Sequence, residues 1–267
     1  MTTFERQQRL IEILRQQPGI RVPEIARLLG VSEGTIRNDL RSLSQAGRLK
    51  RVRGGAVVDA AIRNEAPAFS ARARVNAEAK LYLAREAAHL IDDGDTILCD
   101  ASSTVYHLAH YLADRRNLTV ITNGIELARR LVVYPAHTVI LLGGKMRDDA
   151  AAISGPIAER ALDDLRVKTA FLSATGLAPD SGLYEVDIDE AQLKRKMIAA
   201  AGSVAALIDS SKVGKVDLTL FARLDQISRL FVDAALTAEW RSVLERLSVP
   251  VTICGADNVS AYPKGTA

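Results

Sequence analysis

The amino-acid sequence predicts an α/β protein in two parts, a small module of helices with a terminal hairpin and a larger, doubly wound, mostly parallel α/β domain. Apolar residues at helical spacing in residues 4–43, followed by two short strand-like runs, predict the first part. Short apolar runs that alternate with helices predict the second part. We therefore place the first module in residues 1–58, a linker in residues 59–76 and the larger domain in residues 77–267.

Charge is distributed unevenly between these parts. Residues 1–57 contain eleven Lys and Arg against five Asp and Glu, a net charge of +6, whereas the remaining 210 residues carry a net charge of −3. A compact basic module on a mildly acidic body favours a polyanion as the partner of the first part, and the alternative is an ordinary solvated surface rich in arginine.

Composition excludes several other classes of protein. The 267 residues are 48% hydrophobic and 25% charged, with a mean hydropathy of +0.05, which fits globular domains with real cores. A polar start and the lack of a long apolar run argue against export and membrane spanning, so we expect a cytoplasmic protein. Cys99 and Cys254 each end an apolar run without metal-ligand spacing, so we expect reduced core residues and no cofactor.

Three helices are predicted in the first module. The first ends at Pro18 and Gly19, and the second begins near Pro23 and ends at Gly30. Ser32 is the expected N-cap of the third helix. Its inward face carries apolar residues at positions i, i+4 and i+7, namely Ile36, Leu40 and Leu43.

The outward face of the third helix is polar and suited to base edges and phosphates. Residues 49–58 predict two short strands about a glycine turn, with cations on the outward positions, which would form a basic wing. This order of elements is that of a winged helix-turn-helix, which places its third helix in the major groove. The candidate DNA-binding residues are Ser32, Thr35, Arg37, Asn38, Arg41, Lys50, Arg51 and Arg53. The alternative is a winged helix used only for contacts with protein.

The larger domain contains seven short, nearly continuously apolar runs, the pattern of buried parallel strands. They are residues 95–99, 118–121, 138–142, 169–174, 204–208, 230–232 and 251–253. In a doubly wound sheet, ligands bind beyond the carboxyl ends of such strands.

Polar residues and glycines follow five of these runs. Ser102, Ser103 and Thr104 give three hydroxyls at the expected start of a helix, whose free N–H groups favour a phosphate. A serine there is also an ordinary helix cap, but five polar strand ends together favour a ligand site. The candidate effector-binding residues are Asp100, Ser102, Ser103, Thr104, Thr122, Asn123, Gly143, Gly144, Thr175, Gly176 and Lys212.

The sequence resembles the DeoR family of regulators along nearly its whole length. Residues 6–56, above all VSEGTIRNDL at 31–40 and RGGA at 53–56, resemble its DNA-binding domain, with Asn38 in place of a second arginine and Arg53 in place of a common histidine. Residues 69–72 with Asn76 and Lys80, and residues 118–123, 141–144 and 209–214, resemble its sensor domain, which is similar to ribose-5-phosphate isomerase. In that domain Ser102 replaces a usual glycine and Thr175 a usual acidic residue.

The resemblance implies a regulator, most simply a repressor of a carbohydrate operon, that binds operator DNA as a dimer or tetramer. It implies a phosphorylated sugar or related metabolite as effector, with the loop from Asp100 to Thr104 as phosphate cradle and Lys212 nearby.

An isomerase-like enzyme with a DNA-binding head is the main alternative. The carboxylates of Glu185, Asp187, Asp189 and Glu190 suit proton transfer, although the start of a solvated helix explains them as well. The segment 182–184 has no lysine, so we expect no enzyme activity. His107 and His110 lack a third metal ligand, and Ser102 lacks the turn of a catalytic serine.

Overall fold

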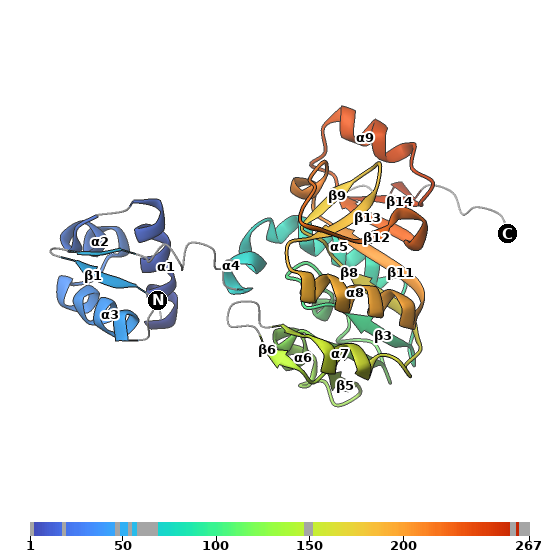
Figure 1. The fold of residues 1–267 in the computed structure, drawn as a ribbon, viewed down its shortest axis with the longest axis horizontal. Helices are drawn as coiled ribbons and strands as arrows, with labels where there is room; N and C mark the ends of the chain where they lie inside the picture. Colours follow the sequence, from blue (N-terminus) through green and yellow to red (C-terminus); the bar gives the residue numbers. More distant parts are fainter. Residues whose placement is uncertain are drawn as a thin grey trace. The chain divides into compact units, whose positions relative to one another are not determined.

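A computed structural model of the protein describes residues 3–17, 20–45, 49–52, 55–57, 69–146, 152–256 and 260–261. The chain forms two compact units, residues 1–66 and residues 67–267 (Figure 1). Among the described residues, no helix is long and apolar enough to cross a membrane. Cys99 and Cys254 are buried free thiols, as predicted.

The first unit is the predicted winged helix-turn-helix. Its helices are α1 (Thr3–Gln16), α2 (Val22–Leu29) and α3 (Glu33–Gln45), and its antiparallel hairpin consists of β1 (Lys50–Val52) and β2 (Gly55–Val57). Gly30 ends α2 in the left-handed conformation with a φ of 64°, which glycine adopts without strain. One core joins all three helices to the hairpin, built from Leu10, Ile11, Leu14, Ile20, Val22, Ile25, Ala26, Ile36, Leu40, Leu43, Leu49 and Ala56.

The second unit is built on an eight-stranded sheet with the order β15-β14-β13-β11-β8-β3-β4-β5, parallel except for β15 at one edge. All seven predicted strands are present in it. They are β3 (Thr96–Cys99), β4 (Thr119–Thr122), β5 (Thr138–Leu141), β8 (Val167–Leu172), β11 (Ala201–Ile208), β13 (Arg229–Asp233) and β14 (Val251–Cys254), and β15 is Ser260–Ala261.

Helices cover both faces of this sheet, which confirms the doubly wound fold (Figure 1). Successive residues of β3 show the division: Ile97 and Cys99 pack into one core, and Leu98 packs into the other. The helix α5 (Ala77–Ala88), the 3-10 helix η2 (Val105–His110) and α6 (Ile125–Leu131) pack on the first face. The helices α7 (Pro156–Ala161), α8 (Ile188–Ala200) and α9 (Ala238–Glu245) pack on the second.

Several elements were not predicted. A three-stranded antiparallel sheet consists of β9 (Gly176–Ala178), β10 (Gly182–Glu185) and β12 (Thr219–Arg223), and β6 (Lys145–Met146) pairs with β7 (Ile153–Ser154). Within the stretch expected to be a linker, residues 69–74 form the helix α4 (Phe69–Arg74). The helix expected after Thr104 is only the six-residue η2, so no α-helix N-terminus faces a ligand there. Close side-chain contacts with neighbouring elements, described below, hold both short helices.

Candidate nucleic-acid interface and anion site

The two faces of α3 differ as predicted. Ile36, Leu40 and Leu43 are buried in the core of the first unit, whereas Arg37, Asn38 and Arg41 are exposed. The hydroxyl of Ser32 accepts a hydrogen bond from the backbone N–H of Thr35 at 3.1 Å, which confirms Ser32 as the N-cap. The buried face therefore holds the helix in place and leaves its cations in solvent.

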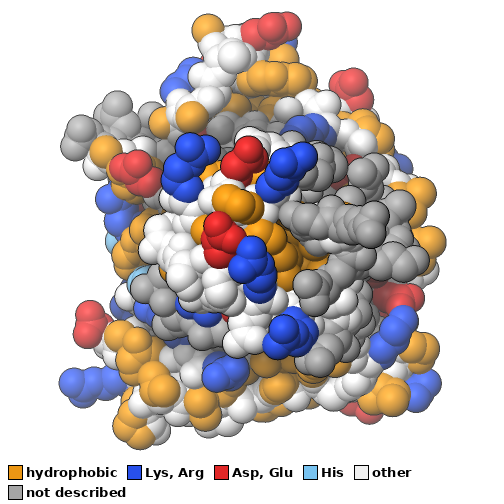
Figure 2. Space-filling view, turned by 90° about the vertical axis from the view of Figure 1, so that its left-hand side faces the viewer, with side chains coloured by type: hydrophobic (Ala, Val, Ile, Leu, Met, Phe, Trp, Pro, Cys, Tyr) orange, Lys and Arg blue, Asp and Glu red, His pale blue; other side chains and the backbone are white. Residues whose placement is uncertain are grey.

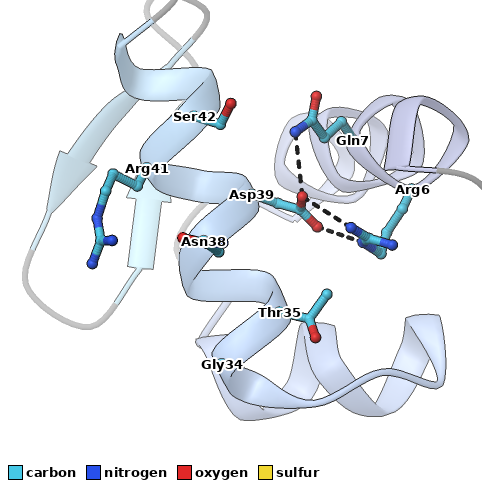
Figure 3. Close-up of a pocket in the computed structure, with 8 residues that line it drawn as sticks. All are labelled: Arg6, Gln7, Gly34, Thr35, Asn38, Asp39, Arg41 and Ser42. Atoms are coloured by element: carbon cyan, nitrogen blue, oxygen red, sulfur yellow. Dashed lines mark hydrogen bonds and ion pairs between the residues drawn. The ribbon is translucent and has the colours of Figure 1, made fainter.

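The carboxylate of Asp39, which sequence reasoning missed, attaches α3 to α1. Asp39 is buried and accepts hydrogen bonds from the side chains of Arg6 and Gln7. The distance from the Arg6 Nε atom to the Asp39 carboxylate is 2.5 Å. Figure 3 shows Asp39 pointing from α3 toward these two side chains, while Arg41 projects from another side of the helix. The signal in the sequence was the position of Asp39, which continues the inward face between Ile36 and Leu43.

A surface pocket of about 570 Å³ lies between α1 and α3 beside this contact (Figure 3). It is lined by polar and charged residues and one glycine, namely Arg6, Gln7, Gly34, Thr35, Asn38, Asp39, Arg41 and Ser42. Such a lining offers hydrogen-bond donors and acceptors to a polar polymer.

Not all of the predicted DNA-binding cations lie among the residues that the structure describes. Arg37 forms an exposed ion pair with Glu33 at 2.6 Å, an arrangement that water and salt screen strongly. Lys50 and Arg51 lie in β1, and Arg53 lies outside the described residues. In the space-filling view, Lys and Arg side chains are scattered among uncharged surface rather than gathered into one block (Figure 2).

In the second unit, Asp100 follows β3 and is almost fully buried. One carboxylate oxygen accepts the backbone N–H of Ser102 at 3.0 Å, and the other accepts the backbone N–H of Ser173 at 2.8 Å. Asp100 therefore joins the loop after β3 to the end of β8 and shapes that loop.

Lys194 of α8 is the second residue that sequence reasoning missed. Its buried Nζ atom lies 2.6 Å from a carboxylate oxygen of Glu185 and 3.4 Å from one of Asp100, and it donates to the carbonyl of Ser173 at 2.8 Å. Burial opposes its charge, but the two carboxylates raise the pKa of Lys194 above its usual value. Glu185 is therefore a buried ion-pair partner and not part of a solvated helix start; Asp187, by contrast, caps α8.

Lys212 and Lys80 bring two more cations to the same strand ends. The Nζ atom of Lys212 donates to the Ser173 hydroxyl at 3.2 Å and lies 3.3 Å from a carboxylate oxygen of Asp209. Lys80 of α5, which belongs to the family resemblance but not to the predicted effector residues, is buried and donates to the Ser103 hydroxyl at 3.1 Å. Burial and the nearby charge of Lys212 lower the pKa of Lys80 to about 8.

The hydroxyls of the loop after β3 have different roles. The Ser102 hydroxyl accepts the backbone N–H of Val105 at 3.1 Å and therefore acts as a cap for η2. The Thr104 hydroxyl is completely buried and has no hydrogen-bond partner among the described residues. A buried donor without a partner is costly, which sets the Thr104 hydroxyl apart from that of Ser103, the acceptor of the Lys80 hydrogen bond.

The other predicted effector residues have contacts of different kinds. Thr122 caps the turn at Gly124, where an added Cβ would lie 3.0 Å from the Ala101 backbone, so the end of β4 packs against the loop. The Thr175 hydroxyl donates to the carbonyl of Tyr184 at 3.1 Å. The remaining residues have local contacts: Asn123 donates to the Ile153 carbonyl at 2.8 Å, Gly144 packs on Ser154, Gly176 packs on Lys215, and Gly143 is exposed.

The two histidines form a packed pair. The rings of His107 and His110 stack at 5.7 Å between centroids, and the Nδ1 atom of His110 lies 3.2 Å from an Arg130 nitrogen. Among the described residues, no group of three His, Cys, Asp or Glu side chains is arranged to hold a metal ion.

Comparison with known proteins gives two family matches. Residues 6–61 match the DeoR-like helix-turn-helix domain, and residues 75–234 match the DeoR C-terminal sensor domain. The HTH-type transcriptional regulator GolR of Listeria innocua is 34% identical over 95% of this chain and 99% of its own length. The transcriptional repressor AccR of Agrobacterium fabrum is 31% identical, with coverage of 92% and 95%, and the repressor GlcR of Bacillus subtilis is 32% identical, with coverage of 95% and 97%.

Solved structures are more distant. A D-ribose-5-phosphate isomerase in complex with phospho-erythronic acid is 15% identical, with a TM-score of 0.39 over 51% of this chain and 54% of its own. A translation initiation factor eIF-2B of Pyrococcus horikoshii is 20% identical, with a TM-score of 0.41 over 59% of this chain and 63% of its own.

Proposed function

The chain belongs to the DeoR family of transcriptional regulators, and on that premise we propose that it represses a carbohydrate-metabolism operon under the control of a phosphorylated sugar or related metabolite. We assign DNA binding to residues 1–58 and effector binding to residues 77–267, with residues 59–76 joining them. Because its target is DNA, we place the protein in the cytoplasm.

The observation that carries DNA binding is the division of α3 into a buried apolar face and an exposed face with Arg37, Asn38 and Arg41. A helix held in this way enters a major groove with its cations and amide toward base edges and phosphates. The wing then contacts the backbone or the minor groove. The proposed DNA contacts are Ser32, Thr35, Arg37, Asn38, Arg41, Lys50, Arg51 and Arg53.

The effector site is proposed at the carboxyl ends of β3 and β11, where the Ser103 and Thr104 hydroxyls lie with Lys80 and Lys212. Lys194 is already paired with Glu185 and Asp100, whereas Lys80 donates to two neutral oxygens, the Arg72 carbonyl and the Ser103 hydroxyl. A phosphate accepts charge-assisted hydrogen bonds from such an ammonium group and satisfies the buried Thr104 hydroxyl. The remaining proposed contacts are Asp100, Ser102, Thr122, Asn123, Gly143, Gly144, Thr175 and Gly176.

A homo-oligomer is the proposed form of the active protein. One winged helix offers few contacts, and two on a repeated site gain affinity through effective concentration. Light scattering at the concentrations used for DNA binding measures the oligomeric state. A monomer that binds its operator with full affinity would refute this proposal.

An isomerase-like enzyme is the second candidate, favoured by one observation. The buried Asp100, Lys194 and Glu185 side chains form a charged network of the kind that proton transfer on a sugar phosphate needs.

Titration of the full-length protein with its own promoter DNA, with and without pentose and hexose phosphates, tests the proposal. We expect at least one sugar phosphate to raise the melting temperature, since a ligand of the native state stabilises it, and to change operator affinity. Aldose–ketose interconversion is assayed with the same compounds. Turnover without any effect on DNA binding would favour the enzyme, and no DNA binding at all would overturn the main proposal.

A further inference from the structure

The helix α4 is held at its C-terminal end by side chains that belong to the proposed effector site. The last carbonyls of any helix lack partners within the helix. In α4 the Arg72 carbonyl accepts a hydrogen bond from the Lys80 Nζ atom at 2.5 Å, and the same atom donates to the Ser103 hydroxyl at 3.1 Å. One ammonium group therefore joins α4 to the loop after β3.

Two further contacts join the same region to the site. The Asn76 side chain, in the bend between α4 and α5, donates to Asp209 at 3.2 Å, and Asp209 is the ion-pair partner of Lys212. The Nε2 atom of His107, in the short helix that follows the loop, lies 3.3 Å from the Ala73 carbonyl. We use the name latch for these three contacts, Lys80 with Arg72, Asn76 with Asp209 and His107 with Ala73.

We infer that the latch transmits effector occupancy to α4, an inference that rests on the proposed effector site. A phosphate oxygen is a stronger acceptor than a carbonyl or a hydroxyl, because both partners of its bond to an ammonium group carry charge. A phosphate at Ser103 therefore competes with the Arg72 carbonyl for Lys80, and it competes for Lys212 with Asp209, the acceptor of Asn76.

When the contacts of the latch weaken, α4 has little stability of its own to hold it. The helix α4 has six residues, and isolated helices of this length are unstable in water. It directly follows residues 58–68, the stretch of chain that leads from the first unit. A change in α4 is thus a change at the point where the DNA-binding unit is joined to the sensor.

Hydrogen–deuterium exchange on the full-length protein separates this inference from the effector site itself. The probes are inorganic phosphate and the pentose and hexose phosphates. We expect slower exchange in residues 100–105 and faster exchange in residues 70–76. Protection of the loop with unchanged or slower exchange in α4 overturns the latch alone. Absence of loop protection with every probe overturns the effector site, and the latch with it.

The variant Asn76→Gly weakens the latch without removing a proposed phosphate ligand. Asn76 has a φ of 53°, which glycine adopts easily, and the matched control is Asn117→Gly, at an exposed position with a φ of 56°. We expect the operator affinity of ligand-free Asn76→Gly to move toward that of the phosphate-saturated wild type. The ratio between the operator affinities of the ligand-free and the phosphate-saturated protein should therefore be smaller in Asn76→Gly than in the wild type, by about threefold or more.

By reciprocity of coupled binding, the phosphate affinity of Asn76→Gly rises by a similar factor, whereas Asn117→Gly behaves as the wild type. A general loss of stability lowers the melting temperature without moving operator affinity in the direction of the effector. An unchanged affinity ratio in Asn76→Gly overturns the latch.

Discussion

The side chain of Arg6 in α1 donates two hydrogen bonds to the carboxylate of Asp39 in α3, one from Nε at 2.5 Å and one from Nη2 at 3.1 Å. Asp39 is 3% exposed, so this is a largely desolvated contact in the middle of the proposed recognition helix. Arg6 and Asp39 thus set the position of α3 against α1, and with it the position of the exposed residues Arg37, Asn38 and Arg41.

Replacing Asp39 by Ala should destabilise the first unit. The substitution removes the hydrogen bonds that the buried Asp39 carboxylate accepts from Arg6 and Gln7, which costs about 1–3 kcal/mol. The measurement is far-ultraviolet circular dichroism on heating, together with hydrogen exchange of α1 and α3. The matched control is Glu33→Ala, which breaks an exposed ion pair with Arg37 and should change stability by less than about 0.5 kcal/mol. Equal stability of the two variants would contradict this role of Asp39.

Replacing Arg37 or Arg41 by Ala should weaken operator binding. We expect a loss of about 1–3 kcal/mol for a side chain that contacts a base, or a decrease of about one in the salt slope for one that contacts a phosphate. Fluorescence anisotropy at several salt concentrations separates the two cases. Arg9→Ala is the control, because Arg9 lines a different pocket of the first unit together with Leu28 and Leu29. The same affinity and salt slope in all three variants would exclude these contacts.

Replacing Lys212 or Ser103 by Ala should weaken phosphate binding. The expected loss for Lys212→Ala is roughly 1.5–3 kcal/mol, that of a charge-assisted hydrogen bond, as measured by calorimetric titration of the free protein. The double variant should lose less than the sum of the two single losses, because both groups act on one phosphate. Lys196→Ala is the control, because Lys196 pairs with Asp163 at an exposed position outside the proposed site, so the affinity of this variant should match that of the wild type. Strict additivity would argue against a shared site.

The fold was predictable where burial is uniform along an element. The core strands are flanked by helices on both faces, so runs such as residues 204–208 consist of consecutive apolar residues and are easily recognised. The two faces of α3 were predictable for a different reason, because Ile36, Leu40 and Leu43 repeat at helical spacing. The strands β9 and β10 could not be predicted from the sequence. Each is short, and the two are defined by their pairing with each other and not by a pattern of side chains.

The candidate site was predictable at strand ends and not on helices. Asp100 and Lys212 follow apolar strands, so their place could be inferred from the order of elements. Lys194 stands in a run with Arg195 and Lys196 that reads as solvated surface. Only the packing of α8 against β10 turns Lys194 toward Glu185. Lys80 was marked by the family resemblance alone, because among the four charged residues of α5 nothing in its spacing assigns it a ligand.

Lys80 also makes the site sensitive to pH. Burial lowers the pKa of its ammonium group to about 8, and the charges of Lys212 and Arg72 act in the same direction, while Asp209 opposes them. The unfolded chain keeps the ordinary lysine pKa near 10.5. Between these two values the unfolded state binds more protons than the folded state, so the contribution of Lys80 to stability rises with pH from about 8 to about 10.5.

Phosphate affinity should change with pH in the opposite direction. A bound phosphate dianion interacts with the ammonium form of Lys80, and that form disappears from the free protein as pH rises through about 8. Between pH 7 and pH 9 the dissociation constant of a sugar phosphate should therefore increase by up to about tenfold, and the ligand itself stays a dianion because its second pKa is near 6. Calorimetric titrations in this range measure the change. In Lys80→Gln the side chain cannot titrate, so the dependence on pH should become shallow, with only the contribution of Lys212 remaining. Parallel profiles for the wild type and Lys80→Gln would show that another group titrates, and would remove Lys80 from the phosphate site.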